Sequence, residues 1–214
     1  MPRSCLWFVV GLLLTSLFGQ QAARQTRQQG AWPVGEVVHG TYRNSTFGFS
    51  CKIPFGWVDR TEEMRADDAP QPGDSVKPNG PVKSLVLLAV FERPPEASGS
   101  TINSAIVIAA EKTSQYSELK SAADYFGPIT ELATEKGFTV VNEPYEFSVG
   151  AKQLVRGDFS KPRGSLTMVQ SSLVTIEKGY AVSFTFIGGT EDEVSSLIAN
   201  LSFPPKKPSG TAHK

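Results

Sequence analysis

The chain has 214 residues, with 21 basic and 21 acidic side chains and a formal net charge of zero. This balance gives no electrostatic reason to expect a nucleic acid or an anionic lipid surface as a partner. The length suits a single domain that buries a packed core of its own.

The N-terminus has the composition of a secretory signal peptide. Arg3 precedes an apolar run from Leu6 to Phe18, which is followed by Gln-Gln and then Ala22-Ala23. The run is shorter than the roughly 20 apolar residues of a membrane-spanning helix. We expect cleavage after Ala22 or Ala23, a secreted or periplasmic location, and no membrane contact after cleavage. An uncleaved N-terminal anchor is the alternative.

The rest of the chain is expected to contain one domain between two flexible ends. Cleavage would remove Cys5 and leave Cys51 alone, so the exported chain would have no internal disulfide and would depend on its core. The expected segments are a signal peptide (1–23), a flexible leader (24–36), a single α+β domain (37–204) and a disordered tail (205–214).

The domain begins with extended segments. Residues 37–42 favour a strand and residues 43–46 a turn. From Phe47 to Ile53, large apolar residues alternate with Gly, Ser and Lys, which predicts an antiparallel strand with Cys51 on its buried face. A proline ends this strand, and Phe55-Gly56-Trp57 favours a compact turn.

In the middle of the chain the spacing of the apolar residues changes. Residues 64–83 are rich in Pro, Gly, Asp and Asn and predict a long irregular segment, whereas residues 84–91 and 105–110 predict strands covered on both faces. Apolar residues three and four apart from Leu119 to Ala133 then predict an amphipathic helix. Gly127-Pro128 falls inside it and predicts a kink, or a second short helix opened by the proline.

Gly137 is expected to end this helix, and strands follow. The turn sequences Gly150 and Lys178-Gly179 predict hairpins, and Thr190 with Glu193 matches the capping box that starts a helix. The expected strands are 138–141, 145–149, 153–159, 166–177 and 180–187. The basic residues of this region are expected to form a solvated hairpin edge: Lys152, Arg156, Lys161 and Arg163.

The order of these elements resembles the Mog1/PsbP-like superfamily. The residues that carry the resemblance are Tyr42-Arg43-Asn44, Phe47-Gly48-Phe49-Ser50, the corner Ile53-Pro54-Phe55-Gly56-Trp57 and the closing segment Asn200-Leu201-Ser202-Phe203. The resemblance covers roughly residues 38–204 and rests on structural residues, so no functional residue is carried over. It implies an α+β fold with a twisted antiparallel β-sheet sandwiched between helices, and a role in binding or assembly.

The residue types available for catalysis are few. His39 and His213 are the two histidines, and no His-x-x-x-His, Cys-x-x-Cys or Gly-x-Ser-x-Gly pattern is present. We therefore expect no zinc site, no Ser-His-Asp triad and no cofactor. A small hydrolase or redox enzyme using His39 or Cys51 is the alternative, although the alternation around Cys51 favours a packing role.

A possible binding groove lies near the corner, formed by Phe55, Trp57, Glu62, Asp67 and Asp68. Trp57 either plugs one end of the sandwich or lines this groove, because long loops on a rigid scaffold often carry binding sites. The acidic residues are expected to be solvated, with calcium binding as the alternative. The sequence thus predicts an exported, non-catalytic binding or assembly module for an unknown protein or small ligand.

Overall fold

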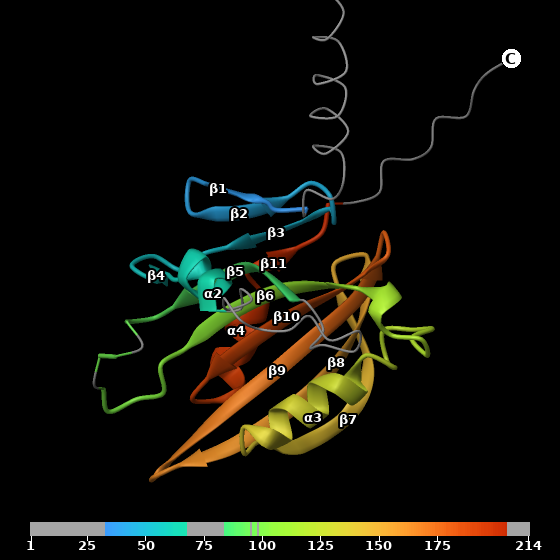
Figure 1. Cartoon of the computed structure of the whole chain (residues 1–214). Helices are drawn as coiled ribbons and strands as arrows, with labels where there is room; N and C mark the ends of the chain where they lie inside the picture. Colours follow the sequence, from blue (N-terminus) through green and yellow to red (C-terminus); the bar gives the residue numbers. More distant parts are fainter. Residues whose placement is uncertain (1–32, 68–83, 95, 98, 205–214) are drawn as a thin grey trace, which may run out of the picture. The chain divides into compact units, whose positions relative to one another are not determined.

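The computed structural model describes residues 33–67, 84–94, 96, 97 and 99–204, and it contains two antiparallel sheets (Figure 1). The four-stranded sheet has the order β1-β2-β3-β11, with β1 (Glu36–Val38), β2 (Thr41–Asn44), β3 (Phe49–Lys52) and β11 (Leu201–Ser202). The seven-stranded sheet has the order β4-β5-β6-β10-β9-β8-β7, with β4 (Val58–Asp59), β5 (Ser84–Phe91), β6 (Ala105–Lys112), β7 (Thr139–Val149), β8 (Lys152–Arg163), β9 (Leu166–Glu177) and β10 (Tyr180–Gly188). The helices are α2 (Thr61–Asp67), the short 3-10 helix η1 (Thr113–Gln115), α3 (Phe126–Glu135) and α4 (Glu191–Ile198). The predicted signal peptide, the segment 68–83 and the tail from 205 lie outside the described residues.

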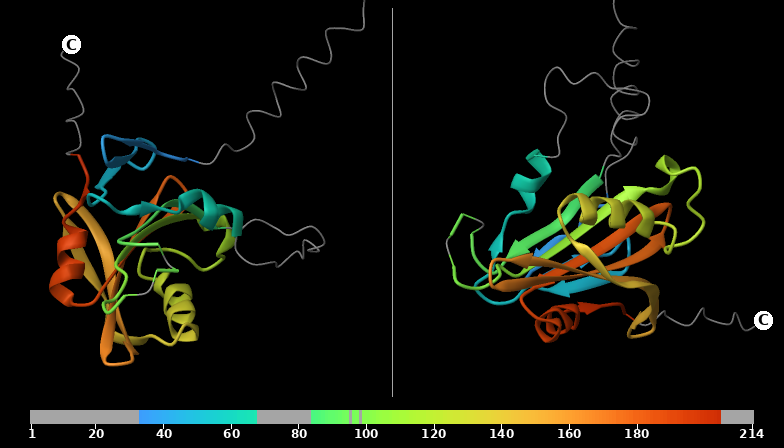
Figure 2. Two further views of the ribbon diagram at one scale, coloured as in Figure 1. Left: turned by 90° about the vertical axis from the view of Figure 1, so that its left-hand side faces the viewer. Right: turned by 90° about the horizontal axis from the view of Figure 1, so that it is seen from below.

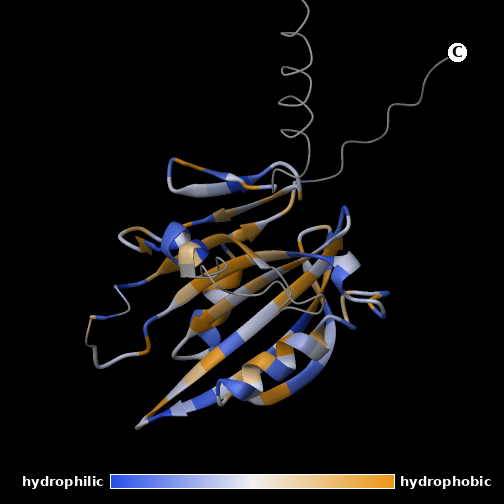
Figure 3. Cartoon of the chain, viewed as in Figure 1, coloured by the Kyte–Doolittle hydropathy of each residue, from blue (hydrophilic) through white to orange (hydrophobic). Residues whose placement is uncertain are grey.

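The expected fold class is confirmed, with a second sheet that the sequence did not predict. Helices α3 and α4 lie on opposite sides of the seven-stranded sheet (Figure 2). The small sheet shares one hydrophobic core with α4 and the central strands of the large sheet, and this core includes Phe49, Leu88, Phe184 and Val194. Hydrophobic residues are concentrated on β5 and β6 of the large sheet (Figure 3).

The N-terminal stretch 37–42 forms a hairpin, so the expected single strand is wrong. His39 and Gly40 have φ angles of 48° and 68°, which suit a two-residue turn between β1 and β2. The alternation predicted downstream is confirmed, because Phe47, Phe49 and Cys51 are all buried.

Two further predicted segments differ from the structure. The segments 138–141 and 145–149 form one edge strand, β7, with an irregular register between Val140 and Tyr145. Pro144 falls in this irregular part, which an edge strand tolerates because one side of its backbone needs no strand partner. Residues 64–67 are helical and belong to α2, although the sequence predicted an irregular segment there.

The predicted helix across 119–133 is reduced to α3, with Gly127-Pro128 in its first turn, where a proline removes no helical hydrogen bond. Gly137 ends it as expected, with φ of 82°. Phe126 and Ala133 pack with Phe159 and other residues in a second core on this face of the large sheet.

The predicted capping box of α4 is present, but one of its two hydrogen bonds is displaced by one residue. The Glu193 amide donates to the Thr190 hydroxyl at 3.1 Å, and the Glu193 carboxylate accepts from the Gly189 amide at 2.8 Å rather than from Thr190. The same carboxylate accepts a hydrogen bond from the buried Ser104 hydroxyl, which ties the start of α4 to the large sheet.

The packing of α3 depends on a glycine in β8. A Cβ atom at Gly157 would lie 2.5 Å from the Phe126 ring, whereas a Cβ atom at Gly127 would meet nothing within 4 Å. We expect Gly157→Val to lower the free energy of unfolding by about 2 kcal/mol, because the Phe126 ring must move. Chemical denaturation monitored by circular dichroism measures this change.

Gly127→Ala is the matched control, because it adds a methyl group to α3 in open space. It should leave stability unchanged or raise it slightly, since alanine favours helix more than glycine does. A Gly157→Val protein as stable as the parent would contradict this account of how α3 is positioned.

Candidate functional site

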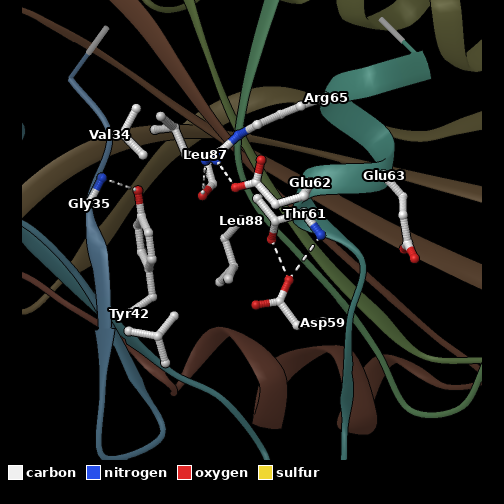
Figure 4. A pocket seen from close by; sticks show the side chains of 11 residues that line it. Val34, Gly35, Tyr42, Asp59, Thr61, Glu62, Glu63, Arg65, Leu87 and Leu88 are labelled. Atoms are coloured by element: carbon white, nitrogen blue, oxygen red, sulfur yellow. Dashed lines mark hydrogen bonds and ion pairs between the residues drawn. The ribbon is translucent and has the colours of Figure 1, made fainter. Parts of the chain in front are cut away.

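A cavity of about 380 Å³ opens between the β1–β2 hairpin and the α2–β5 region (Figure 4). This volume is within the range of about 300–1,000 Å³ that is usual for small-ligand pockets. We call it the Tyr42 cavity. Its lining residues are Val34, Gly35, Val37, Tyr42, Asp59, Thr61, Glu62, Glu63, Arg65, Leu87 and Leu88.

Tyr42 provides a hydroxyl group to the cavity wall. Its side chain is 2% exposed, and its hydroxyl oxygen accepts hydrogen bonds from the Gly35 amide at 3.0 Å and from Asn44 Nδ2 at 3.3 Å. Burial raises the pKa of Tyr42, while these two hydrogen bonds and the charge of Arg65 oppose the rise. The hydroxyl therefore stays protonated at neutral pH. Among the described residues its proton has no acceptor, so it is available to a ligand.

The opposite wall is formed where α2 covers the edge of β5. Strand β4 pairs only with the end of β5, at Phe91 and Val90, and no other strand of the described residues pairs with that edge. Arg65 replaces the missing strand: its Nε donates to the Val86 carbonyl at 2.6 Å and its Nη2 to the Leu87 carbonyl at 3.2 Å.

Thr61, at the start of α2, also bonds to the backbone of β5. Its hydroxyl accepts from the Ala89 amide at 2.9 Å and donates to Asp59 Oδ1 at 2.6 Å, while its own amide donates to the same carboxylate oxygen at 2.9 Å. These contacts fix both the helix and the orientation of Asp59 before any ligand is present.

The cavity carries a surplus of negative charge. Asp59, Glu62 and Glu63 line it together with a single cation, Arg65. Arg65 forms an ion pair with Glu62, and Glu63 forms one with Arg60, which is not among the lining residues. The apolar side chains of Leu87 and Leu88 complete a site suited to a ligand with a positively charged group and a short apolar stem.

The residues of the predicted groove differ in their surroundings. Phe55 is fully exposed in the turn, whereas Trp57 is partly buried and packs against the main core. Glu62 lines the Tyr42 cavity, and neither Phe55 nor Trp57 does. Asp67 is the last residue of α2, and Asp68 lies outside the described residues.

The two residues named for the enzyme alternative have different surroundings. His39 is an exposed residue of the β1–β2 turn. Cys51 has no exposed surface, and burial raises the pKa of its thiol to about 12, so the thiol is protonated at neutral pH. A buried, protonated cysteine fills space in the core and does not act as a nucleophile.

Within the described residues, no group of three or more His, Cys, Asp or Glu side chains is arranged to hold a metal ion. The calcium alternative draws on the acidic residues Glu62, Glu63, Asp67, Asp68 and Asp74. Asp68 and Asp74 lie outside the described residues, and the alternative stays a prediction. The helices of the described part of the chain are all too short or too polar to cross a membrane.

The structure contains a buried polar cluster on β7, β8 and β9 that the sequence did not predict. Asp158 is 7% exposed, and its Oδ1 accepts from Arg156 Nε at 2.8 Å and from the Ser171 hydroxyl at 2.5 Å. Its Oδ2 accepts from the Tyr145 hydroxyl at 2.9 Å and from Asn142 Nδ2 at 3.3 Å.

The expectation that Arg156 is a solvated edge residue is therefore wrong. Its guanidinium lies 5.0 Å from the centre of the Phe147 ring and also donates to Ser171. The Asp158 carboxylate has both oxygens fully engaged, which marks the cluster as a structural network that joins three strands.

Comparisons with known proteins find likeness in structure only. No family model matches the chain, and no curated protein matches it. The similar solved structures include a Pseudomonas aeruginosa protein of unknown function described as a putative regulator, with 15% identity, a TM-score of 0.37, and coverage of 64% of this chain and 90% of that one.

Two others belong to the superfamily that the sequence resembles. The Ran-binding protein Mog1p of Saccharomyces cerevisiae has 14% identity and a TM-score of 0.38, and the match covers 73% of this chain and 80% of that one. Cyanobacterial PsbP (CyanoP) of Synechocystis sp. PCC 6803 has 15% identity and a TM-score of 0.43, and the match covers 82% of this chain and 99% of that one. These are likenesses of structure at low identity, and no role, partner or location is carried over from them to this chain.

We expect the polar cluster around Asp158 to make the protein less stable in acid. Hydrogen bonds from Ser171, Arg156 and Tyr145, with the charge of Arg156, outweigh burial and lower the pKa of Asp158. A lowered folded-state pKa stabilises the fold above the unfolded value of about 3.9, and this contribution is lost as the pH falls through the folded value. We expect Asp158→Asn to cost about 3 kcal/mol at pH 7 and progressively less below about pH 4.

Denaturation of both proteins across this pH range measures the difference. Glu146→Gln is the control, because Glu146 is an exposed carboxylate on the neighbouring strand β7. A constant difference between Asp158→Asn and the parent at every pH would exclude a role for the Asp158 charge.

Cys51 is expected to be unreactive in the native protein. Iodoacetamide should modify it only at the rate of unfolding, because the thiol is both buried and protonated. Mass spectrometry at several denaturant concentrations tests this expectation. Fast native-state alkylation of Cys51 would restore the enzyme alternative.

Proposed function

We propose that this chain is an exported, non-catalytic binding module and that its ligand or partner inserts a group into the Tyr42 cavity. The observation that carries the proposal is the cavity itself, with an unused hydroxyl proton on one wall and a carboxylate-rich wall opposite. Both walls are held by hydrogen bonds that exist without a ligand, and such preorganisation lowers the entropic cost of binding.

The charge of the cavity selects the kind of group that enters. Asp59 and Glu62 favour a cation, while the apolar surface of Leu87, Leu88 and Val37 suits a methylene chain. A lysine or arginine side chain of a protein partner combines these two properties. Its backbone carbonyl would be a suitable acceptor for the Tyr42 hydroxyl.

Two further parts of the proposal rest on features outside the cavity. The N-terminal 23 residues support export, and Phe55 supports a protein partner, because a fully exposed aromatic side chain is a common contact residue in interfaces. The turn that carries Phe55 leads directly into β4 and Asp59. We therefore propose that a partner contacts Phe55 and Trp57 as well as Glu62, Asp67 and Asp68.

Val37 and Val38 offer a matched pair of variants for testing the cavity. Val37 pairs with Tyr42, shares its face of the sheet and lines the cavity, whereas Val38 is on the opposite face of the same strand. Both side chains are exposed by more than a third, so larger residues are tolerated. We expect Val37→Trp to block ligand entry and Val38→Trp to have no effect.

The probe is N-acetyl-lysine amide, with N-acetyl-norleucine amide as its uncharged counterpart. In nuclear magnetic resonance titrations the lysine derivative should shift the amide signals of Gly35 and Tyr42, and the norleucine derivative should not. Val37→Trp should abolish these shifts. Equal shifts with both probes, or unchanged binding to the Val37→Trp protein, would refute the proposed site.

A further inference from the structure

A second cavity, of about 480 Å³, lies where the β5–β6 connection meets the ends of β8, β9 and β10. Phe91, Ala105 and Ile187 are consecutive partners across β5, β6 and β10, so they are on one face of the sheet. Met168 of β9 also lines the cavity. These four side chains form a continuous apolar floor.

Arg93 stands at the rim of this cavity and is held in place by the connection that follows β5. Its backbone amide donates to Asn103 Oδ1 at 3.1 Å, and its carbonyl accepts from Asn103 Nδ2 at 2.9 Å. Its guanidinium donates to the Thr101 hydroxyl at 3.0 Å and to the Thr101 carbonyl at 2.6 Å. A Cβ atom at residue 99 would lie 2.7 Å from this guanidinium, so Gly99 allows the close packing.

One donor of this fixed guanidinium is unused. Arg93 Nε is buried and has no hydrogen-bond partner among the described residues. A buried donor without an acceptor is rare in native proteins, and a bound ligand is one of its ordinary explanations. Arg93 forms an ion pair with Glu92 at 3.1 Å, and Glu92 is not a lining residue.

Arg163, at the end of β8, adds a second positive charge to the rim. It is exposed, and within the described residues its side chain makes no ion pair or hydrogen bond. The lining residues of the cavity, which are all in the described part of the chain, include these two arginines and no acidic side chain. The charge of this cavity is thus opposite to that of the Tyr42 cavity.

We propose that this second cavity binds a small molecule with a short apolar chain and one anionic group, either a carboxylate or a phosphate. The chain lies on the floor formed by Phe91, Ala105, Met168 and Ile187. The anionic oxygens accept hydrogen bonds from Arg93 and Arg163, the side chain best suited to both kinds of anion. This inference stands independently of the function proposed for the Tyr42 cavity.

Calorimetric titration of the purified full chain tests the proposal with four probes that share one chain length. Octanoate and octyl phosphate represent the two anions, octanol removes the charge, and octylamine reverses it. We expect at least one anion to bind, octanol to bind much more weakly and octylamine not to bind. Preference for octanoate would assign a carboxylate ligand, and preference for octyl phosphate a phosphate ligand.

Arg163→Gln should weaken binding of the preferred anion about tenfold, which is the effect of one lost charge-assisted hydrogen bond. Arg43→Gln is the matched control, because Arg43 is an exposed arginine on β2 that does not line this cavity. Ile187→Trp should block the cavity and abolish binding. Equal binding of octanol and the anions, or equal effects of Arg163→Gln and Arg43→Gln, would overturn the proposal.

Discussion

The contact between Phe49 of the small sheet and Phe184 of the large sheet determines where the other parts of this fold lie. The two rings meet edge to face, with centroids 4.9 Å apart and an interplanar angle of 83°. Phe203 packs against both rings, at 6.1 Å and 6.0 Å, and Tyr42 packs against Phe49 at 5.8 Å. A sheet of four short strands buries little surface by itself. The small sheet therefore depends on this aromatic cluster for its position. The Tyr42 side chain is consequently placed by hydrophobic packing as well as by the hydrogen bonds of its hydroxyl.

The Tyr42 cavity results from the way the large sheet ends. Strand β4 is too short to cover the edge of β5, and an uncovered edge favours association with other chains. Helix α2 solves this problem with the side chains of Thr61 and Arg65, which bond to the backbone of β5. The cavity lies between this helix and the hairpin of the small sheet. The residues that protect the edge are therefore also the wall of the binding site.

The sequence predicted those elements whose period is regular and missed those that depend on distant partners. The alternation from Phe47 to Ile53 and the capping box at Thr190 are local signals, and the structure contains both. The sequence predicts two strands where β7 is continuous across Pro144. Proline is unfavourable in most strands and acceptable at an edge, and edge position depends on the whole sheet. Of the residues that line the Tyr42 cavity, the sequence predicted only Glu62 as a binding residue. Tyr42 and Arg65 reach the cavity only through the packing of separate elements. The Arg156–Asp158 pair depends on the register of three strands and has no signature along the chain.

The charge distribution shows why composition alone could not indicate the two cavities. A formal net charge of zero argues against an extended field that would attract nucleic acid or a membrane. Binding of a small charged group depends instead on a few side chains within a short distance, where desolvation strengthens each interaction. The Tyr42 cavity has three acidic residues and one arginine, and the cavity at Arg93 has two arginines and no acidic residue. A neutral chain can therefore carry two sites of opposite charge preference, because opposite charges that cancel in the total are separated by the fold.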